Sequence, residues 1–334
     1  MKAVGITGTG KYLPSKIIKN DDFVKMGLDT SDEWIMERTG IRERRICEPS
    51  MSTSDMGVIA GEQAIRNAGL EPKDIDLVIV ATTSADYPAF PSTACLIQHR
   101  LGLRNIGAFD VAAACTGFNY ALTMGAQCIQ TGFCRHVLVI GADCLSKLVD
   151  WTDRSVCILF GDGAGAVVLS EVKPGYGILA SELHSKGSVG DILITRGGGS
   201  REPFSQRVLE EKLHCIAMDG KAVFKLAVSN IVPTLKNTLK SVGLSPADLD
   251  LLVPHQANIR IIDLTKDKLN LSDDQVITNL EKYGNTSAAS IPIALAEAVE
   301  QNRVKEGDLV AFLGFGGGFT WASTLLKWGG IIHE

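Results

Sequence analysis

Three side chains of this chain have the chemistry of a nucleophile with two hydrogen-bonding partners: the thiol of Cys115, the imidazole of His255 and the amide of Asn285. Cysteine attacks as its thiolate, and neighbouring hydrogen-bonding groups commonly assist such a nucleophile. Each residue also has an ordinary structural explanation, because cysteine and histidine are often core residues and asparagine often caps a helix. The case for chemistry therefore depends on where the chain places them.

Cys115 lies at a predicted junction between a strand and a helix. The apolar residues at 106, 108, 109 and 111 predict a buried strand, and helical spacing begins near Thr116 and continues to Ile129. Unpaired N–H groups at a helix N-terminus favour a thiolate, so we expect Cys115 to be the most readily alkylated of the eight cysteines. The small residues of 112–114 leave room for a substrate.

The chain repeats itself at an interval of about half its length. Residues 69–80 and 243–254 share the order glycine, leucine, proline and aspartate before an apolar strand, and each segment follows a predicted helix. A second pair of strands, at 137–141 and 310–314, recurs at nearly the same interval. This predicts an α/β protein with two similar halves, 1–173 and 174–334, in which helices cover layered sheets.

The duplication brings residues from both halves to one place. Open α/β sheets bind ligands at their strand ends. His255 follows the predicted strand 249–253, and Asn285 lies in a polar loop that enters a helix near Ala288. The glycine-rich run 314–318 lies between two strand-like segments, where free backbone N–H groups suit an oxyanion hole.

Composition excludes several other functions. The net charge of −5 gives no field that would attract nucleic acid, and no apolar run is long enough to span a membrane. The N-terminus lacks a signal-peptide core and the eight cysteines lack zinc-site spacing, so we expect reduced thiols, no metal and a cytoplasmic protein. The glycine runs 5–10 and 161–166 supply no helix N-terminus for a dinucleotide.

Several motifs, spread along nearly the whole chain, occur in the same order as in a known family, which makes the resemblance to that family specific. The sequence resembles the β-ketoacyl-acyl-carrier-protein synthase III family of thiolase-like condensing enzymes. The matching segments are Thr30–Ile35 with Arg38–Arg42, Ala113–Phe118, Asp153-Arg154 with Phe160–Ala166, Pro254–Asn258, Tyr283–Ser287 and Gly314–Gly318. The combination of Cys115, His255 and Asn285 distinguishes this branch from elongating synthases and from thiolases.

The resemblance implies an αβαβα thiolase-like fold and a homodimer. It implies that Cys115 accepts a short acyl group from acyl-CoA, which then condenses with malonyl-acyl carrier protein and releases carbon dioxide, initiating fatty acid synthesis without a metal or redox cofactor. The backbone N–H groups of Cys115 and Gly317 are candidates for the oxyanion hole, while His255 and Asn285 would donate to the enolate oxygen.

The resemblance also implies residues for binding. The expected coenzyme A contacts are Thr30, Trp34, Arg38, Arg154, Gly220, Phe224, Asn258 and Arg260. The expected acyl-pocket residues are Phe90, which the family inserts into the neighbouring subunit, Phe160 and Phe315. The expected carrier-docking residues are Lys225, Arg260, Lys266 and Lys268, although scattered cations on a helix are more often a solvated face.

Two alternatives to this activity remain open. A related acyltransferase or ketide-forming condensing enzyme on the same scaffold would share Cys115, and a binding protein without catalysis would not need the three reactive residues. The sequence leaves the length and branching of the primer undetermined, because these depend on the width of the acyl pocket.

Overall fold

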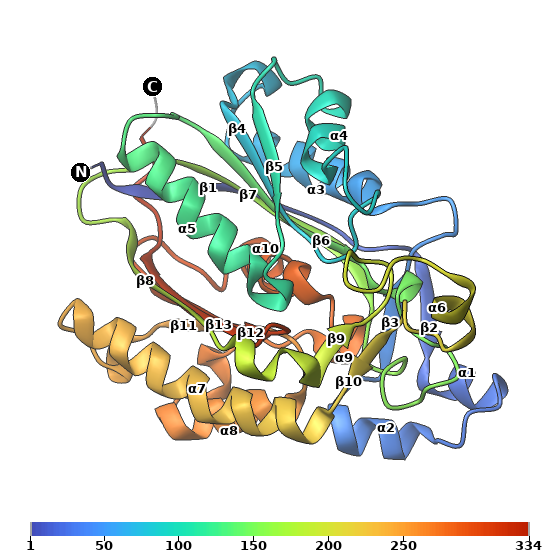
Figure 1. The fold of residues 1–334 in the computed structure, drawn as a ribbon. Helices are drawn as coiled ribbons and strands as arrows, with labels where there is room; N and C mark the ends of the chain where they lie inside the picture. Colours follow the sequence, from blue (N-terminus) through green and yellow to red (C-terminus); the bar gives the residue numbers. More distant parts are fainter. Residues whose placement is uncertain (1, 333–334) are drawn as a thin grey trace.

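The computed structural model describes residues 2–332, in which two mixed sheets lie at the centre (Figure 1). The first sheet has the order β1-β7-β6-β4-β5, and the second has the order β11-β12-β13-β8. The strands of the first sheet are β1 (Val4–Tyr12), β4 (Leu77–Ala81), β5 (Gly107–Val111), β6 (Val137–Cys144) and β7 (Asp162–Glu171). Those of the second are β8 (Gly177–Ser185), β11 (Leu251–Pro254), β12 (Leu309–Gly316) and β13 (Thr320–Lys327).

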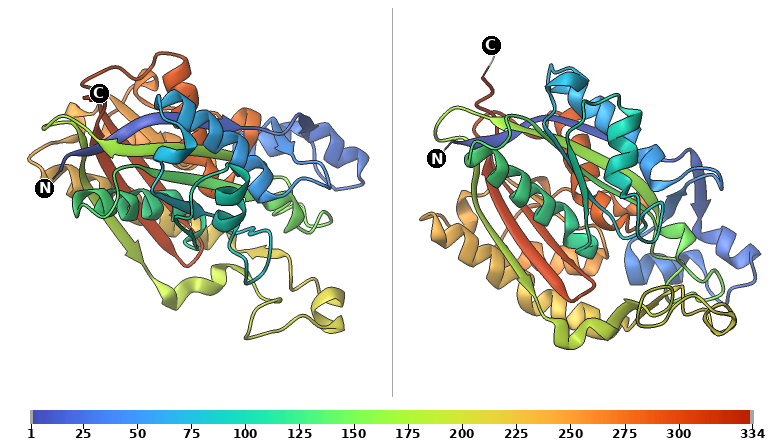
Figure 2. Two further views of the ribbon diagram at one scale, coloured as in Figure 1. Left: turned by 90° about the horizontal axis from the view of Figure 1, so that it is seen from above. Right: turned by 45° about the horizontal axis from the view of Figure 1, so that its top comes forward.

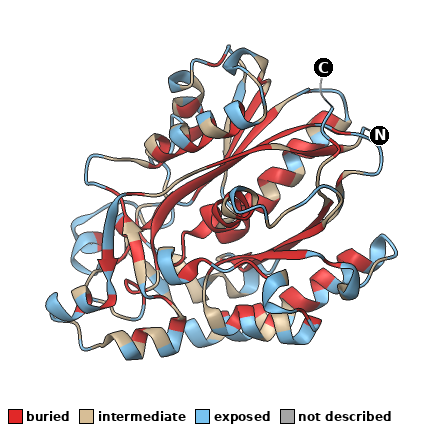
Figure 3. Cartoon of the chain, turned by 180° about the vertical axis from the view of Figure 1, so that it is seen from behind, coloured by how far each residue is buried: buried red, intermediate tan, exposed pale blue. Residues whose placement is uncertain are grey.

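Helices form three layers around these sheets, which gives the order αβαβα. Helices α3 (Thr53–Asn67) and α4 (Thr93–Arg100) cover the outer face of the first sheet, and α7 (Gly220–Ser241) and α8 (Ile259–Leu269) cover that of the second. Helices α5 (Gly117–Gln130) and α10 (Ser290–Glu300) lie between the sheets, where buried residues concentrate (Figure 3).

The strand pattern explains this layering. Successive side chains of a strand point to opposite faces, and β4 is buried along its whole length. Ile79 packs into the central layer with α5 and α10, whereas its neighbours Val78 and Val80 pack against α3 and α4. Apolar residues at every position are therefore the mark of a strand covered on both sides.

The two sheets repeat one topology. In each, a pair of parallel strands is followed by two antiparallel ones, so that β4, β6, β7 and β1 correspond to β11, β12, β13 and β8. The helix-to-strand turns match too, because Gly69 and Gly243 both adopt positive φ, of 70° and 76°. The counterpart of β5 is only a parallel bridge between Leu252 and Val276. We propose the halves 1–173 and 174–334 as the organisation of the chain.

The strand predicted at 106–111 is present as β5, but the prediction that it is buried is wrong. β5 is the last strand of its sheet, and Phe109 and Val111 are only half-buried while Gly107 is exposed. The apolar pattern does not reveal the order of strands in a sheet, so the sequence could not show that one edge of this strand is open.

Smaller elements gather together at one end of the molecule (Figure 2). They are β2 (Lys16–Lys19), α1 (Asn20–Lys25), α2 (Asp32–Thr39), β3 (Glu43–Ile46), β9 (Leu193–Thr195), α6 (Gln206–Glu210), β10 (Ile216–Met218) and α9 (Leu280–Tyr283). The segment that carries α6 extends away from the body of the molecule. Within residues 2–332, no helix is both long and apolar enough to cross a membrane.

Candidate active site

Cys115 lies in a single 3₁₀ turn, η2 (Ala114–Thr116), that leads directly into α5. The turn begins at Ala114, whose φ of 48° is uncommon for a residue with a side chain and is a form of backbone strain often found at functional sites. Gly316 packs on the nucleophile, since a Cβ atom there would lie 2.7 Å from the backbone nitrogen of Cys115. The end of β12 can approach Cys115 only because residue 316 is glycine.

His255 follows the last residue of β11, as the sequence predicts. Its backbone N–H donates to the Leu313 carbonyl at 2.8 Å, and its ring meets the ring of Phe315 edge-on with centroids 5.2 Å apart. The side chain is 2% exposed, and burial lowers the pKa of His255 to about 3. The imidazole is therefore neutral at physiological pH, which leaves it able to donate one hydrogen bond.

The backbone of Asn285 is tied to the segment before β7. Its N–H donates to the Leu159 carbonyl at 2.8 Å, and its carbonyl accepts from the Gly161 N–H at 3.0 Å. The side-chain oxygen accepts from the Ser287 backbone N–H at 2.9 Å. Since this bond holds the oxygen end of the amide, the NH₂ end is the one left to donate to a substrate.

The three predicted residues line one cavity of about 100 Å³. A second, mostly apolar cavity of about 330 Å³ shares Cys115, Phe160 and Leu193 with it. Cys115 thus stands where a smaller chamber that contains His255 and Asn285 adjoins a larger, apolar chamber. A thioester held here would have its reacting carbonyl at the thiol and its acyl chain in the apolar chamber.

The protonation state of Cys115 differs from the sequence expectation. The thiol is only 6% exposed, and burial raises the pKa of Cys115 to about 12, although a hydrogen bond to Ser287 acts in the opposite direction. Desolvation therefore outweighs the helix N-terminus, and the resting group is a thiol. Cys95 is exposed, so it and not Cys115 is the cysteine most open to a general alkylating reagent.

Part of the predicted coenzyme A set forms an aromatic and cationic cluster. The guanidinium groups of Arg38 and Arg154 lie 5.3 Å and 5.0 Å from the ring centroid of Trp34. Arg154 also pairs with Asp29 at 3.0 Å. The indole of Trp34 can stack on a flat base, and the two guanidinium groups can pair with its phosphates. The cluster can therefore receive a nucleotide if Arg154 gives up part of its stacking on Trp34.

The other predicted contacts connect this cluster to the cavity. Gly220, Phe224 and Asn258 line the smaller chamber. The Asn258 amide donates to the Arg38 carbonyl at 3.0 Å, and its oxygen caps α8 by accepting from the Arg260 N–H at 2.9 Å. The Thr30 hydroxyl is buried with no hydrogen-bond partner among the described residues.

The three predicted acyl-pocket residues have different positions. Phe160 lines both chambers, whereas Phe315 lines only the smaller one, beside His255. Phe90 is 86% exposed and lines neither chamber of its own chain. The sequence missed most of the apolar wall, which consists of Leu145, Leu148, Leu193, Ile194 and Ile216. Periodicity could not identify these residues, because they lie on short irregular segments that meet only in the fold.

The predicted docking cations are not equally available. Lys225 and Lys268 are exposed on α7 and α8. Lys266 is held by Asp273 at 2.5 Å and lies 3.9 Å from Asp263, and its hydrogen bond to Asp273 raises the pKa of Lys266. Arg260 lies 3.9 Å from Glu37. Carboxylates on and beside α8 therefore offset much of its positive charge.

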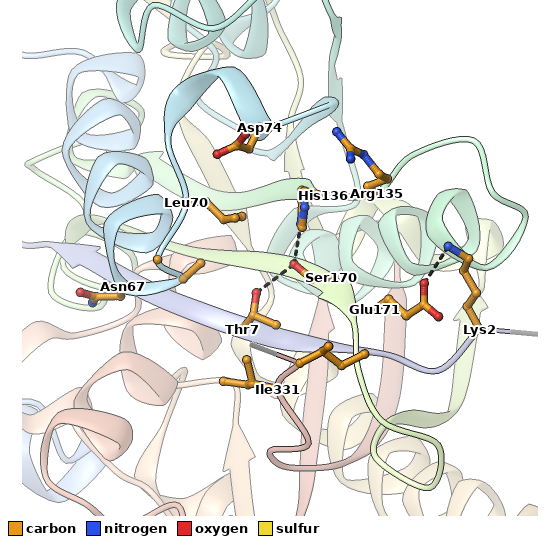
Figure 4. Close-up of a pocket in the computed structure, with 13 residues that line it drawn as sticks. Lys2, Thr7, Asn67, Leu70, Asp74, Arg135, His136, Ser170, Glu171 and Ile331 are labelled. Atoms are coloured by element: carbon orange, nitrogen blue, oxygen red, sulfur yellow. Dashed lines mark hydrogen bonds and ion pairs between the residues drawn. The ribbon is translucent and has the colours of Figure 1, made fainter. Parts of the chain in front are cut away.

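A larger cavity, of about 670 Å³, contains none of the predicted site residues (Figure 4). Several of its polar groups are engaged with one another: the Ser170 hydroxyl bonds to Thr7 and to His136, and Lys2 pairs with Glu171. It offers no cysteine or other activated nucleophile. Across residues 2–332, no group of three histidine, cysteine or carboxylate side chains has the arrangement of a metal site.

Two layers of similar topology, with a cysteine at the N-terminus of one central helix and a histidine and an asparagine from the other half, define a thiolase-type condensing enzyme. Comparison with known proteins gives the family. Models of 3-oxoacyl-[acyl-carrier-protein] synthase III match residues 109–187 and, for its C-terminal part, residues 239–328. The chain belongs to the β-ketoacyl-acyl-carrier-protein synthase III family.

Individual relatives agree with this assignment. The β-ketoacyl-[acyl-carrier-protein] synthase III of Caldanaerobacter subterraneus subsp. tengcongensis is 51% identical, over 98% of both chains. The crystal structure of 3-oxoacyl-[acyl-carrier-protein] synthase III from Aquifex aeolicus VF5 is 44% identical, with a TM-score of 0.90 over 97% of this chain and 100% of that one. The priming β-ketosynthase of the R1128 polyketide pathway is 36% identical, with a TM-score of 0.90 over 99% and 98%.

Proposed function

We propose that this acyltransferase condenses a short acyl-CoA with malonyl-acyl carrier protein, forming a 3-ketoacyl-acyl carrier protein, coenzyme A and carbon dioxide. The observation that carries the proposal is the position of Cys115 between two chambers. One chamber presents His255 and Asn285, and the other is an apolar space of about 330 Å³. The experiments that test it are the separate assays of acyl transfer and decarboxylation described in the Discussion.

The first half-reaction transfers the acyl group to the enzyme. The sulfur of Cys115 attacks the thioester carbonyl, and the carbon–sulfur bond to coenzyme A breaks. The departing sulfur takes up the proton of the Cys115 thiol and leaves as coenzyme A thiol. The backbone N–H groups of Cys115 and Gly317 are our candidates for donors to the oxyanion, because both residues line the apolar chamber beside the sulfur.

The second half-reaction forms the new carbon–carbon bond. Loss of carbon dioxide from malonyl breaks a carbon–carbon bond and moves the electron pair onto an enolate, whose oxygen needs hydrogen-bond donors. The neutral ring of His255 and the NH₂ of Asn285 supply them. The enolate carbon then attacks the acyl group on Cys115, and the sulfur leaves and takes up a proton. Neither half-reaction, as written, uses a metal ion or changes an oxidation state.

The binding surfaces follow from the same geometry. Coenzyme A would lie from the Trp34 cluster, past Asn258, to the smaller chamber. We propose that carrier protein docks beside this entrance, where Lys225 adjoins Phe224 of the chamber wall. Because the chain carries −5 overall, an acidic carrier must be attracted by a local group of cations.

We also propose a homodimer in which Phe90 enters the partner subunit. The open edge of β5 leaves backbone groups for a further strand, and exposed edges are usually paired or covered. Phe90 is highly exposed and lines neither chamber of its own chain. A cytoplasmic location remains a prediction, supported by eight cysteines without a disulfide.

A ketide-forming enzyme with a specialised primer is the second candidate, and the similarity to the R1128 priming β-ketosynthase favours keeping it. It would use the same Cys115 and differ in the chain that the apolar chamber accepts. Steady-state kinetics with acetyl, branched and longer acyl-CoA primers separates the two candidates. Equal use of several long primers in place of acetyl or short branched ones would favour the specialised enzyme.

A further inference from the structure

Gln256 has a polar side chain that is completely buried. Its NH₂ group donates to the carbonyl of Pro254 at 2.7 Å and to that of Ile277 at 3.1 Å. Its oxygen accepts from the backbone N–H groups of Asn279 at 3.0 Å and Leu280 at 3.2 Å. Two carbonyls on one side and two N–H groups on the other fix the two ends of the amide, and all four hydrogen bonds that a glutamine side chain can form are made.

These hydrogen bonds join the end of β11 to the start of α9. β11 ends one residue before His255, and α9 (Leu280–Tyr283) ends two residues before Asn285. The first N–H groups of a helix have no partner within the helix, so the oxygen of Gln256 caps the N-terminus of α9. One buried amide therefore connects the segment that carries His255 to the segment that carries Asn285.

The ring of His255 depends on its surroundings and its backbone for its position. Its Nδ1 atom is buried and forms no hydrogen bond within residues 2–332. A histidine that acts in a site is often oriented by a partner on its second ring nitrogen, and no described residue has that role here. The backbone N–H of His255 bonds to Leu313, and Gln256 is the next residue. The anchors of the main chain, with the ring of Phe315, therefore set where the imidazole lies.

A second anchor holds α9 from α10. Glu297 accepts from the Asn279 amide at 2.9 Å and from the Tyr283 hydroxyl at 2.6 Å. The first of these residues precedes α9 and the second is its last residue, so both ends of the helix are fixed. A helix of 4 residues has little stability of its own, so α9 depends on such contacts, and Asn285 follows directly from α9.

We propose that Gln256 is a positioning residue that holds His255 and Asn285 in the relative arrangement in which both can donate to the enolate oxygen. The inference rests on the proposed function, because it assigns a task within the decarboxylation step. Two donors converge on one oxygen only if their segments keep a fixed separation, and a displacement of about 1 Å can cost about 10²-fold in rate. Gln256 lines neither chamber, so it acts through its neighbours and not on the substrate.

The nucleophile is held independently of this amide. Cys115 lies in the turn before α5, and the hydroxyl of Thr116 in that turn donates to the hydroxyl of Thr320 at 2.7 Å. The four hydrogen-bond partners of Gln256 all lie outside that turn and outside α5. Loss of the amide should therefore disturb decarboxylation and leave acyl transfer to Cys115 largely intact.

The test compares Gln256→Met, Asn285→Ala, the two combined, and a control, Gln275→Met, in the full-length protein. Methionine is unbranched like glutamine but has no amide. The amide of Gln275 is a matched control, because it donates to the Leu249 carbonyl at 2.6 Å and accepts from the Ser272 N–H at 3.0 Å. It thus joins the chain before β11 to the chain before α9, at the end of the strand away from the site, and lines neither chamber.

The readouts are acylation by labelled acyl-CoA and release of labelled carbon dioxide at saturating malonyl-carrier. Gln256→Met should release carbon dioxide about 10²-fold more slowly and keep acylation within about threefold of the wild type. Gln275→Met should change neither rate. The combined variant should be at most about tenfold slower than Gln256→Met, because the Asn285 amide is already displaced there, although Asn285→Ala alone should cost about 10²–10³-fold.

This lack of additivity separates positioning from a general loss of structure, which would leave the full cost of Asn285→Ala in place. Carbon dioxide release within about threefold of the wild type in folded Gln256→Met, or a full additional loss in the combined variant, would overturn the proposal. If Gln256→Met does not fold, Gln256→Glu, which keeps an oxygen to cap α9, decides by the same two criteria. No carbon dioxide release from the wild-type protein would instead count against the proposed function.

Discussion

The backbone N–H of Ser287 donates to the side-chain oxygen of Asn285 at 2.9 Å, across only one intervening residue. The bond assigns the two ends of the amide, because the oxygen is occupied and the NH₂ is the end left to donate. It depends on the left-handed backbone of Ser287. A residue that sequence motifs present as part of a loop is in this way held by hydrogen bonds of both its backbone and its side chain.

Asn285→Asp should therefore lose decarboxylation while keeping its place. A carboxylate still accepts from the Ser287 N–H, but it has no N–H to offer the enolate and adds a negative charge next to it. We expect carbon dioxide release to fall by about 10²–10³-fold. The measurement is release of labelled carbon dioxide from malonyl-carrier. Activity within tenfold of the wild type would show that Asn285 is not a donor to the enolate.

Because His255 is neutral, the rate of decarboxylation should not change on the acid side of the pH profile through protonation of this residue. Since burial lowers the pKa of His255 to about 3, its protonation state does not change between pH 5 and pH 8. The rate of carbon dioxide release at saturating substrate should show no step near pH 6.5. A step near pH 6.5 that disappears in His255→Asn would contradict a neutral histidine.

The same burial should make folding stability depend on pH. Between about pH 6.5 and pH 3 the unfolded chain binds a proton at His255 that the native protein does not, so stability falls as the pH falls. The limiting slope for one such group is about 1.4 kcal/mol per pH unit. Denaturant unfolding at several pH values should give a shallower acid slope for His255→Asn than for the wild type, with His184→Asn as control.

Acyl-CoA and iodoacetamide should select different cysteines. Cys95 is exposed, whereas Cys115 is buried with a raised pKa, so brief treatment with iodoacetamide at pH 7.5 should label Cys95 first. Acyl-CoA should acylate Cys115, because binding places the thioester at that sulfur. Peptide mapping measures both. Acylation of Cys95 or Cys215 in preference to Cys115 would remove Cys115 as the nucleophile.

The docking proposal predicts a difference between two lysines. Lys225→Glu should raise the Michaelis constant for malonyl-carrier and leave acyl transfer from acyl-CoA nearly unchanged. Lys266→Glu should have a smaller effect, because Asp273 and Asp263 already offset that charge. Lys236, also exposed on α7, gives the matched control as Lys236→Glu. Carrier kinetics and salt dependence unaffected by Lys225→Glu would place the docking surface elsewhere.

The sequence predicted the parts of the site that lie in continuous motifs. Cys115 and His255 follow apolar strands, and Asn285 precedes a helix, so local pattern and resemblance together located all three. The predicted helix at the docking segment is α8, and the glycine runs 5–10 and 161–166 lie mainly in β1 and β7, as expected of segments without a dinucleotide loop.

What the sequence missed depends on contacts between distant segments. Asp143 is a single aspartate at the end of an apolar strand, and the hydrogen bond that it accepts from the Ala288 N–H crosses from one half of the chain to the other. The pairing of Lys266 with Asp273 depends on the turn after α8. The raised pKa of Cys115 comes from burial, which a local motif does not reveal. Strand order, which left β5 at an edge, is equally absent from local pattern.

The most direct test of the central claim measures the two half-reactions separately in Cys115→Ala and Asn285→Ala. Protein is first incubated with labelled acyl-CoA and the acyl group is located by mass spectrometry; malonyl-carrier is then added and carbon dioxide is measured. Cys115→Ala should accept no acyl group and form no ketoacyl product. Asn285→Ala should keep most of its acylation and lose carbon dioxide release by about 10²–10³-fold. Ketoacyl product from Cys115→Ala, or equal loss of both steps in Asn285→Ala, would contradict the account.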